Sequence, residues 1–378
     1  MSSGRDGKAT PTDRLARIAT ILCIAQICLF TGCESRNNEP NADFGEWLGE
    51  SVNAENYAQV DGSYKLTFPR DHRPHNEFLT EWWYVTCTLA TDEGRRFGVQ
   101  FTLFRRSLAA SIEEPNSWRS GQIYMAHVAL SDVKNKKHFD FERYSREHAE
   151  LAGVESEPFR AFLENWSLES TTSKFFPLTL RIKTDAFEVD LQMTQTKPIV
   201  LQGDEGYSKK SPNHASYYYS IPRMASTGKL AVGSHTFDVS GTSWMDREWS
   251  SGLLGRQYEG WYWFAISFSD GRDLVVFSLR DRNTGFDDDR VALWIQTDGS
   301  TTPIRKDSWA MEPLRKWKQW PVEWKLSIEQ ERFLVSALFD NQEMNTSIPY
   351  WEGMVDVLER NTPVGSGYME LTGYSPRN

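Results

Sequence analysis

Two aromatic-rich hairpin patterns, about 180 residues apart, constrain the fold of this chain more than any other feature. In each, an aromatic run is followed by a turn that holds an acidic residue and a glycine, and then by an apolar run ending in arginine. The paired runs are residues 82–89 with 97–105 and residues 261–268 with 274–280. Such runs around a turn predict β-hairpins. A repeat of this length exceeds solenoid periods and indicates duplication of a whole domain.

Most of the remaining sequence has the same strand-like pattern of aromatic and β-branched runs. Further strand-like runs, separated by polar or glycine breaks, cover residues 122–130, 138–144, 176–183, 186–193 and 228–240. Residues 157–165 alone have a helical look. A chain of 378 residues is long enough for two domains with real cores. We therefore predict an all-β protein of two antiparallel β-domains, barrels or sandwiches, over residues 60–235 and 236–378.

The N-terminus is predicted to be an export signal. Arg14 and Arg17 precede an apolar run over residues 18–30, which is too short to span a bilayer. The residues ending at Cys33 resemble a bacterial lipobox, so residues 1–33 are expected to be a signal peptide with Cys33 as the lipidated residue. The alternative is an ordinary secretory signal. We expect a lipoprotein of the cell envelope that faces the periplasm, or else a secreted or periplasmic soluble protein.

Residues 34–59 are polar and are predicted to be a flexible tether. Cys23 and Cys28 would leave with the signal, so Cys87 is the cysteine expected to remain as a thiol in the mature chain, and no intramolecular disulfide is expected. Cys87 lies in an apolar strand-like context. A buried, inert thiol is therefore favoured over a nucleophile.

The charge of the chain limits its partners. The net charge is −10, and removing residues 1–33 takes away four basic and two acidic residues, which leaves about −12. This acidity argues against a nucleic-acid partner. Because the chain has no basic run, the acyl group is the expected membrane link.

Common catalytic and cofactor motifs are missing from the sequence, so neither a metal nor a cofactor is predicted. His72 and His75 have the spacing of some metal sites, but no third ligand cluster accompanies them, and loop histidines are favoured. Residues 281–285, followed by three aspartates at 287–289, hint at calcium. The glutamate that closes an EF-type loop is missing there, so a solvated turn is favoured.

Charged residues embedded in aromatic strands are the main functional signal. By strand alternation, one face is expected to carry Trp244, Asp246 and Glu248, and the opposite face Met245, Arg247 and Trp249. Carboxylates placed against aromatic rings lose hydration, which raises their pKa unless an arginine pairs with them. The functional interpretation is an acid in an apolar cavity. The structural interpretation is a buried ion pair that closes a barrel end, formed with Arg105, Arg247 or Arg280.

The candidate catalytic residues are Asp246 and Glu248 as acids and Trp249, whose ring would stabilise a carbocation. The chain has 15 tryptophans, and an apolar pocket is a place where many large rings can line a cavity. The candidate ligand-binding residues are Glu81, Trp82, Trp83, Tyr84, Arg105, His127, Tyr218, Arg247, Trp261, Trp263, Trp351 and Glu352.

From about Tyr64 to Tyr374 the chain resembles the AttH-like branch of the carotenoid 1,2-hydratase (hydroxyneurosporene synthase) family. The resemblance includes Thr80-Glu81-Trp82-Trp83-Tyr84 and Trp244-Met245-Asp246-Arg247-Glu248-Trp249. The other matching stretches are residues 68–72 with His75, 97–100 with 104–106, 124–127, 201–208, 216–220, 260–264, 350–353 and 367–374.

This resemblance implies two tandem lipocalin-like β-barrels, which agrees with the internal repeat. It also implies a lipoprotein role beside ABC-transporter permeases of the envelope export type. The family's hydratases add water to a terminal isoprenoid double bond without a cofactor, using a histidine and a tryptophan in the motif that resembles residues 246–249. Here Trp249 is kept, but Arg247 stands in place of the histidine. Arginine stays protonated and cannot be the acid, so Asp246 or Glu248 would have to serve.

Three functions follow from these observations. The first is a lipoprotein that binds an apolar lipid or isoprenoid and is accessory to an ABC-type export system. The second is a cofactor-free hydratase or lyase that acts on an isoprenoid or other unsaturated lipid. The third is a scaffold whose barrels are filled by their own side chains.

Overall fold

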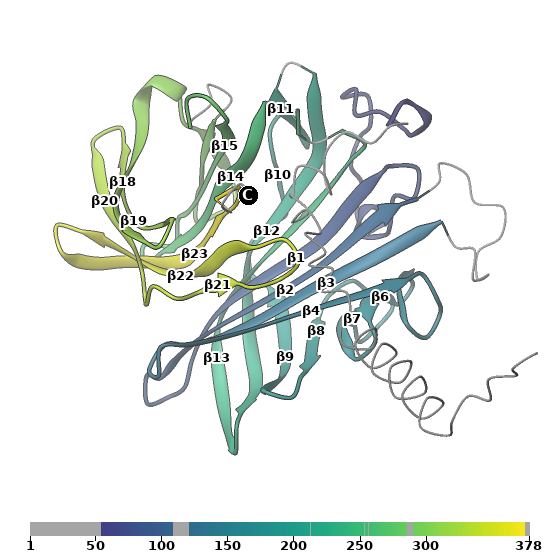
Figure 1. The fold of residues 1–378 in the computed structure, drawn as a ribbon, viewed down its shortest axis with the longest axis horizontal. Helices are drawn as coiled ribbons and strands as arrows, with labels where there is room; N and C mark the ends of the chain where they lie inside the picture. The colour runs from purple at the N-terminus through teal and green to yellow at the C-terminus, as the bar shows by residue number, and fades with distance from the viewer. Residues whose placement is uncertain are drawn as a thin grey trace, which may run out of the picture. The chain divides into compact units, whose positions relative to one another are not determined.

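Two antiparallel sheets, each curled around its own apolar core, form the part of the protein that the structure describes (Figure 1). The structure is a computed structural model that describes residues 54–108, 121–211, 213–252, 254–255, 257–285 and 290–374. Within these residues there are only strands and three short 3-10 helices, η1 (Ala54–Asn56), η2 (Arg70–His72) and η3 (Lys306–Ser308). The predicted all-β class is confirmed.

The first sheet has 13 strands in the order β4-β3-β2-β1-β13-β12-β9-β8-β7-β6-β5, with β10 and β11 paired to β12. Its strands are β1 (Thr80–Ala90), β2 (Arg96–Ser107), β3 (Gln122–Asp132), β4 (Lys137–Arg146), β5 (Ala152–Ser156), β6 (Phe159–Leu163), β7 (Trp166–Ser170), β8 (Leu178–Lys183), β9 (Phe187–Gln195), β10 (Val200–Leu201), β11 (Tyr207–Ser211), β12 (His214–Val232) and β13 (His235–Ser250).

The second sheet has 10 strands in the order β17-β16-β15-β14-β23-β22-β20-β19-β18, with β21 paired to β22. Its strands are β14 (Tyr258–Phe268), β15 (Asp273–Asp281), β16 (Val291–Ile295), β17 (Thr301–Pro303), β18 (Trp309–Trp317), β19 (Trp320–Ile328), β20 (Glu331–Ala337), β21 (Glu343–Met344), β22 (Tyr350–Glu359) and β23 (Thr362–Leu371).

The two predicted hairpins are equivalent elements of the two sheets. β1 pairs with β2 so that Glu81 lies opposite Arg105, and the two side chains form a buried ion pair. β14 pairs with β15 with a register shift between Tyr258 and Gly260, so Arg280 lies opposite Gly260 and forms its ion pair with the neighbouring Glu259. The repeated arginine thus pairs with a glutamate of the adjacent strand in both sheets, which supports duplication of one ancestral unit.

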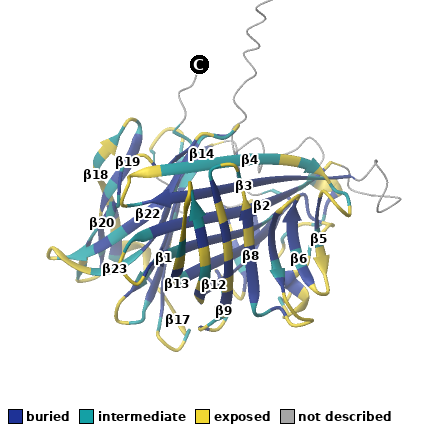
Figure 2. Ribbon diagram, turned by 90° about the horizontal axis from the view of Figure 1, so that it is seen from below, coloured by how far each residue is buried: buried dark blue, intermediate teal, exposed yellow. Residues whose placement is uncertain are grey.

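Central strands of both sheets are buried on both faces (Figure 2). In β14, Tyr262 and Phe264 point into the core of the second sheet, whereas Trp261 and Trp263 face the first sheet. In β1, Trp83 points into the core of its own sheet, and Trp82 and Tyr84 point outward. This double burial explains why these strands are aromatic almost without interruption rather than alternating with polar residues.

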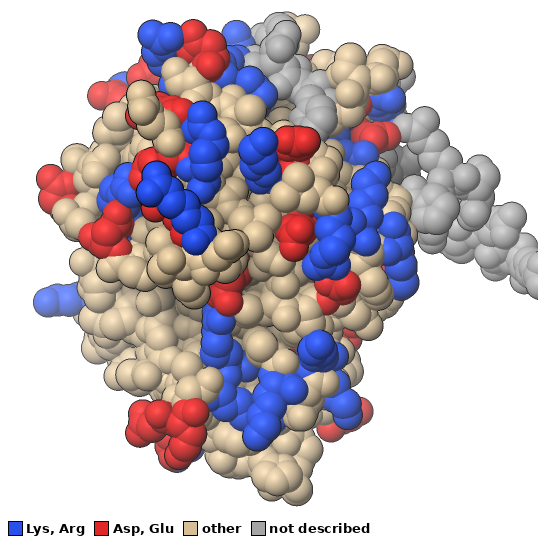
Figure 3. Space-filling model, turned by 90° about the vertical axis from the view of Figure 1, so that its left-hand side faces the viewer, with Lys and Arg blue, Asp and Glu red and all other residues tan. Residues whose placement is uncertain are grey.

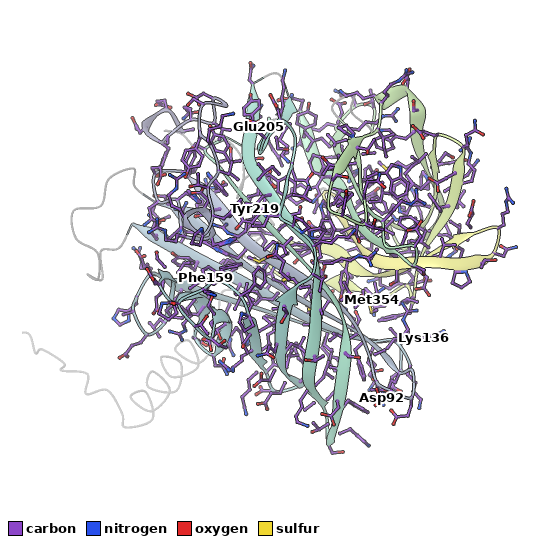
Figure 4. All side chains as sticks on the ribbon, turned by 180° about the vertical axis from the view of Figure 1, so that it is seen from behind. Asp92, Lys136, Phe159, Glu205, Tyr219 and Met354 are labelled. Atoms are coloured by element: carbon purple, nitrogen blue, oxygen red, sulfur yellow. The ribbon has the colours of Figure 1, made fainter. Side chains whose placement is uncertain are left out.

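The outward faces of the two sheets pack against each other through a third apolar cluster. Met354 of β22 belongs to it and lies where the two sheets meet (Figure 4). A side chain added at Gly98 of β2 would collide with Met354 and Tyr368, so glycine permits the close approach of the sheets. Ion pairs between Arg96 and Asp356 also join them.

The structure corrects three predictions made from the sequence: one domain boundary, one helix and the end of the tether. Residues 236–250 were assigned to the second domain, but β13 pairs with β1 and β12, so the division between the sheets falls after Ser250. Residues 157–165 contain strand β6 rather than a helix, because β6 pairs with β5 and β7. Residues 54–59, which were assigned to the tether, contain η1 and the buried Tyr57, and the backbone N–H of Ala58 donates to the carbonyl of Glu77.

Cys87 is a free, buried cysteine, as predicted. Burial raises the pKa of its thiol to about 12, which keeps the sulfur protonated and unreactive. On the face drawn in Figure 3, basic and acidic side chains are interspersed, with no large patch of one sign. Among the described residues no helix is long and apolar enough to cross a membrane. The predicted signal peptide, Cys33 and most of the predicted tether lie outside the described residues.

Candidate active site between the two sheets

A pocket of about 60 Å³ lies between the outward faces of the two sheets. The interiors of the sheets are occupied by their own side chains, including Trp83 and Trp249 in the first and Trp320 and Trp324 in the second. The sequence predicts barrels that enclose a ligand, whereas this pocket lies between the two sheets. The pocket is lined by Trp82, Tyr84, Thr102, Phe104, Lys210, Tyr218, Asp246, Glu248, Leu254, Trp261, Trp263, Phe277, Tyr350, Glu352 and Glu370.

The first sheet contributes the buried carboxyl group of Asp246, a residue of β13, to the pocket. Its two oxygens accept hydrogen bonds from the hydroxyls of Ser220 and Tyr218 and from the indole N–H of Trp244. Burial raises the pKa of Asp246 to about 7, although these three donors oppose the shift. A carboxyl group with this pKa exchanges its proton near neutral pH, which is the range in which general acids and bases are most effective.

Glu248 lies two residues further along the same face of β13 and is paired with a cation. Lys210 Nζ lies 2.8 Å from Glu248 Oε1, and the Ser216 hydroxyl also donates to Glu248. The Lys210 ammonium lies over the rings of Tyr218 and Phe277, at 4.5 Å from the centroid of the latter. Glu248 is therefore held as half of an ion pair at the edge of the pocket, whereas Asp246 has no cationic partner among the described residues.

The second sheet contributes Glu352 of β22 and Glu370 of β23. The Tyr84 hydroxyl donates to Glu352 Oε1 at 2.7 Å, and the Trp261 indole N–H donates to Glu370 Oε1 at 2.9 Å. Burial, followed by the negative charge of Glu370, raises the pKa of Glu352 well above its ordinary value. Burial also raises the pKa of Glu370, and the nearby Asp246 and Glu248 add to the effect. Both sheets thus hold carboxyl groups that favour the neutral form.

Aromatic rings separate these carboxyl groups from water. Tyr84 and Trp263 meet edge to face with centroids 5.2 Å apart, and Trp244 meets Trp263 at 6.3 Å. The Trp263 indole N–H donates to the hydroxyl of Tyr218. The polar atoms of the rings therefore bind one another or the carboxyl groups, and the ring faces are left to contact an apolar ligand.

The predicted alternation of β13 is confirmed, and it separates the predicted site residues into two groups. Arg247 and Trp249 point into the first sheet, away from Asp246 and Glu248. There Glu81 accepts hydrogen bonds from Arg247 Nη2 at 2.7 Å and from Arg105 Nε at 3.2 Å. The structure thus contains both arrangements considered for the embedded charges, an ion cluster inside the barrel and acids in the pocket, on opposite faces of one strand.

The structure brings six predicted ligand-binding residues to the pocket, namely Trp82, Tyr84, Tyr218, Trp261, Trp263 and Glu352. Glu81, Trp83, Arg105 and Arg247 belong instead to the buried ion cluster, with the Arg247 guanidinium 3.9 Å from the centre of the Trp83 ring. His127 lies behind the pocket and hydrogen-bonds the hydroxyl of Tyr350, which does line it. Trp351 is buried in the core of the second sheet, where its indole N–H donates to the backbone of Asp340.

The two histidines considered as metal ligands are part of this buried interior. His75 stacks on Trp249 with ring centroids 3.8 Å apart and contacts both Glu81 and Asp71. His72 stacks on Phe175, and its Nδ1 bonds the Tyr219 hydroxyl. Among the described residues, no three histidine, cysteine, aspartate or glutamate side chains lie close enough together to hold a metal ion.

Sequence reasoning missed Glu370 and Lys210. Glu370 stands between Met369 and Leu371 in β23, where Tyr368 is the one aromatic residue. It therefore lacks the flanking tryptophans that singled out Asp246. Lys210 offers no such signal, because its burial depends on Glu248 of another strand.

A second, outer cavity of about 390 Å³ adjoins this inner pocket. Lys210, Tyr218 and Phe277 line both, so these three residues form the neck between them. Ligand pockets commonly measure roughly 300–1,000 Å³. The inner pocket therefore has room for the reacting end of a substrate, and the outer cavity for the remainder.

Comparison with known proteins places this architecture in one family. The AttH-like family profile matches residues 59–374. A crystal structure of an AttH protein from Nitrosomonas europaea is similar at 31% identity and a TM-score of 0.76, over 84% of this chain and 100% of that one.

Kievitone hydratase from Nectria haematococca has the same fold at a TM-score of 0.62 and 16% identity, over 84% of this chain and 96% of its own. No curated protein matches the sequence. The family match and the Nitrosomonas europaea structure show that the chain belongs to the AttH-like family.

Proposed function

We propose that this protein is a cofactor-free hydratase or hydro-lyase that acts on an unsaturated apolar substrate, such as an isoprenoid. One observation carries the proposal. Asp246, Glu352 and Glu370 meet in a pocket with aromatic walls, and burial raises the pKa of all three. Perturbed carboxyl groups gathered in an apolar pocket are typical of acid–base sites.

The chemistry needs only these groups and water. In hydration, a carboxylic O–H bond breaks as its proton forms a C–H bond at one carbon of the double bond. The other carbon becomes electron-deficient and bonds the oxygen of water, and a carboxylate takes the proton that this water releases. The ring faces of Trp82, Trp261 and Trp263 line the space in which positive charge develops, and aromatic faces attract cations.

The fold comparison supports the same class of reaction. A hydratase shares the fold over most of its length, although at 16% identity the likeness concerns the fold alone. The pocket of this chain supplies the local argument, because burial raises the pKa of Asp246 and of Glu352. The substrate of this protein remains part of the proposal.

A second candidate function is ligand binding by an envelope lipoprotein, anchored at Cys33 and accessory to an ABC-type permease. The outer cavity favours it, because about 390 Å³ of space beside an aromatic neck suits an apolar ligand whether or not it reacts. The anchor and the transporter partner are proposals from the sequence, since Cys33 lies outside the described residues.

Isotope labelling distinguishes the two candidates. Incubated with linear isoprenoid alkenes in heavy-oxygen water, the protein is expected to incorporate one labelled oxygen into a product alcohol. Asp246→Asn should reduce this incorporation at least 100-fold, because the loss of one acid or base typically costs about 10²–10⁴ in rate. The matched control is Glu312→Gln, an exposed residue of β18, which should leave it unchanged. Native mass spectrometry that shows retained isoprenoid, without any label in the product, would favour the binding function instead.

A further inference from the structure

Glu352 and Glu370 are direct cross-strand neighbours. β22 and β23 are antiparallel, and their register places the Cα atoms of these two residues opposite each other. Residues in this relation project to the same face, with Cβ atoms roughly 4.5–5.5 Å apart. Glu352 is buried and Glu370 is partly buried, and both line the inner pocket, so two carboxyl groups share one small volume.

Among the described residues that line the pocket, Lys210 is the one cation, and Glu248 pairs with it. The titratable groups that act on the two glutamates or respond to them are Tyr84, Tyr350, Tyr368, Asp246 and Glu248, none of which carries positive charge. Two like charges in such a volume repel strongly, so the pair retains a proton where an isolated glutamate would lose it. This is the electrostatic situation of a carboxyl dyad.

The two oxygens of Glu352 have different surroundings. Oε1 accepts the hydrogen bond from the Tyr84 hydroxyl, whereas Oε2 is buried without a hydrogen-bond partner. A buried polar atom without a partner costs free energy unless a proton or a ligand satisfies it. Asp246 differs, because three donors already engage its oxygens and stabilise the carboxylate form.

We propose that Glu352 and Glu370 share one proton at neutral pH, and that Glu352 Oε2 presents this proton to the pocket. The use of this proton rests on the proposed function. In hydration, the O–H bond at Glu352 breaks as the C–H bond forms, water bonds the other carbon, and Asp246 as carboxylate takes the proton from that water. Exchange with solvent then returns Asp246 to the carboxylate and the dyad to its protonated form. The proton donor and the proton acceptor thus come from different sheets.

Infrared titration of the full chain tests the shared proton without any substrate. The C=O stretch of protonated carboxyl groups is followed from pH 5 to pH 10, and the wild type should show a titration step above neutral pH. Glu352→Gln and Glu370→Gln should each abolish the same step, because a shared proton belongs to the pair rather than to either residue. Survival of the alkaline step in either folded variant, or its absence from the wild type, overturns the proposal.

The matched control is Glu312→Gln, an exposed glutamate of β18 that does not line the pocket. This substitution should leave the alkaline step intact. Near-ultraviolet circular dichroism checks that each variant is folded, and if Glu352→Gln does not fold, Glu370→Gln decides the question alone.

The labelling experiment separates this inference from the proposed function. If the alkaline step behaves as expected but no isoprenoid takes up labelled oxygen, the shared proton stands and the hydratase function fails. If hydration occurs and Glu352→Gln retains more than one tenth of the wild-type rate, Glu352 is not the proton donor.

Discussion

Replacing Glu81 with glutamine is expected to destabilise the protein by about 3–5 kcal/mol, the typical cost of removing one partner from a buried ion cluster. Glu81 is fully buried and accepts hydrogen bonds from Arg105, Arg247 and both the backbone and the ring of His75. The variant leaves two buried guanidinium groups without their carboxylate. Urea unfolding followed by tryptophan fluorescence measures the loss.

The repeat supplies the control for this prediction. Glu259 pairs with the repeated arginine of the second sheet, Arg280, at 2.7 Å, but this pair is partly open to solvent. Glu259→Gln should therefore cost only about 1 kcal/mol, because solvent screens such a pair. Equal losses for the two variants would contradict the view that the first cluster is a structural plug isolated from water.

Replacing Asp246 with asparagine is expected to stabilise the protein above neutral pH by about 2–4 kcal/mol. Burial raises the pKa of Asp246 from 3.8 to about 7, so the folded protein retains a proton that the unfolded chain loses between these values. The unfolded state is therefore favoured progressively as the pH rises from about 4 to about 7. Asparagine has the same shape and no proton to lose, and its amide can still bond Tyr218 and Trp244.

The sign and the pH window of this effect are both testable. The stability difference between Asp246→Asn and the wild type should grow from pH 5 to pH 7 and then level off, when measured by urea unfolding at each pH. Asp298→Asn is the control, because hydrogen bonds from Ser300 lower the pKa of this exposed aspartate, and no gain is expected. A gain that is constant with pH would mean that Asp246 is ionised in the folded protein throughout.

The inner face of β13 stabilises the fold, whereas its outer face carries a buried carboxyl group that lowers stability. Arg247 and Trp249 on the inner face of β13 fix the strand within the first sheet. Asp246 on the outer face is held in a dry pocket at a cost in stability. Such a cost is usual at functional sites, where groups are kept in protonation states that water would not favour.

The hairpins could be predicted from the sequence, and so could the side chains that share each face of β13, because strand alternation is a local property. Trp244, Asp246 and Glu248 share a face whatever the rest of the fold does. The arrangement of the sheets could not be predicted in this way, because it depends on close contacts such as that of Gly98 with Met354. The predicted domain boundary after residue 235 was wrong because Gly233 forms the turn between β12 and β13 within the first sheet. In the sequence, such a glycine turn resembles a break between domains.

The pocket between the sheets could not be predicted from the sequence for a related physical reason. Many tryptophans suggested hollow barrels, but the rings on inward faces fill each sheet, and the rings on outward faces form the pocket. Sequence alternation assigns a residue to a face, and only the packing of the two sheets shows which face remains accessible to a ligand.

A crystal structure of Asp246→Asn soaked with a short isoprenoid alkene tests the central claim most directly. We expect the alkene between the two sheets, in contact with Trp82 and Trp261 and with its double bond beside Glu352 Oε2. Alkene density inside either curled sheet, or none between the sheets in a crystal that binds the alkene elsewhere, would contradict the assignment of the site.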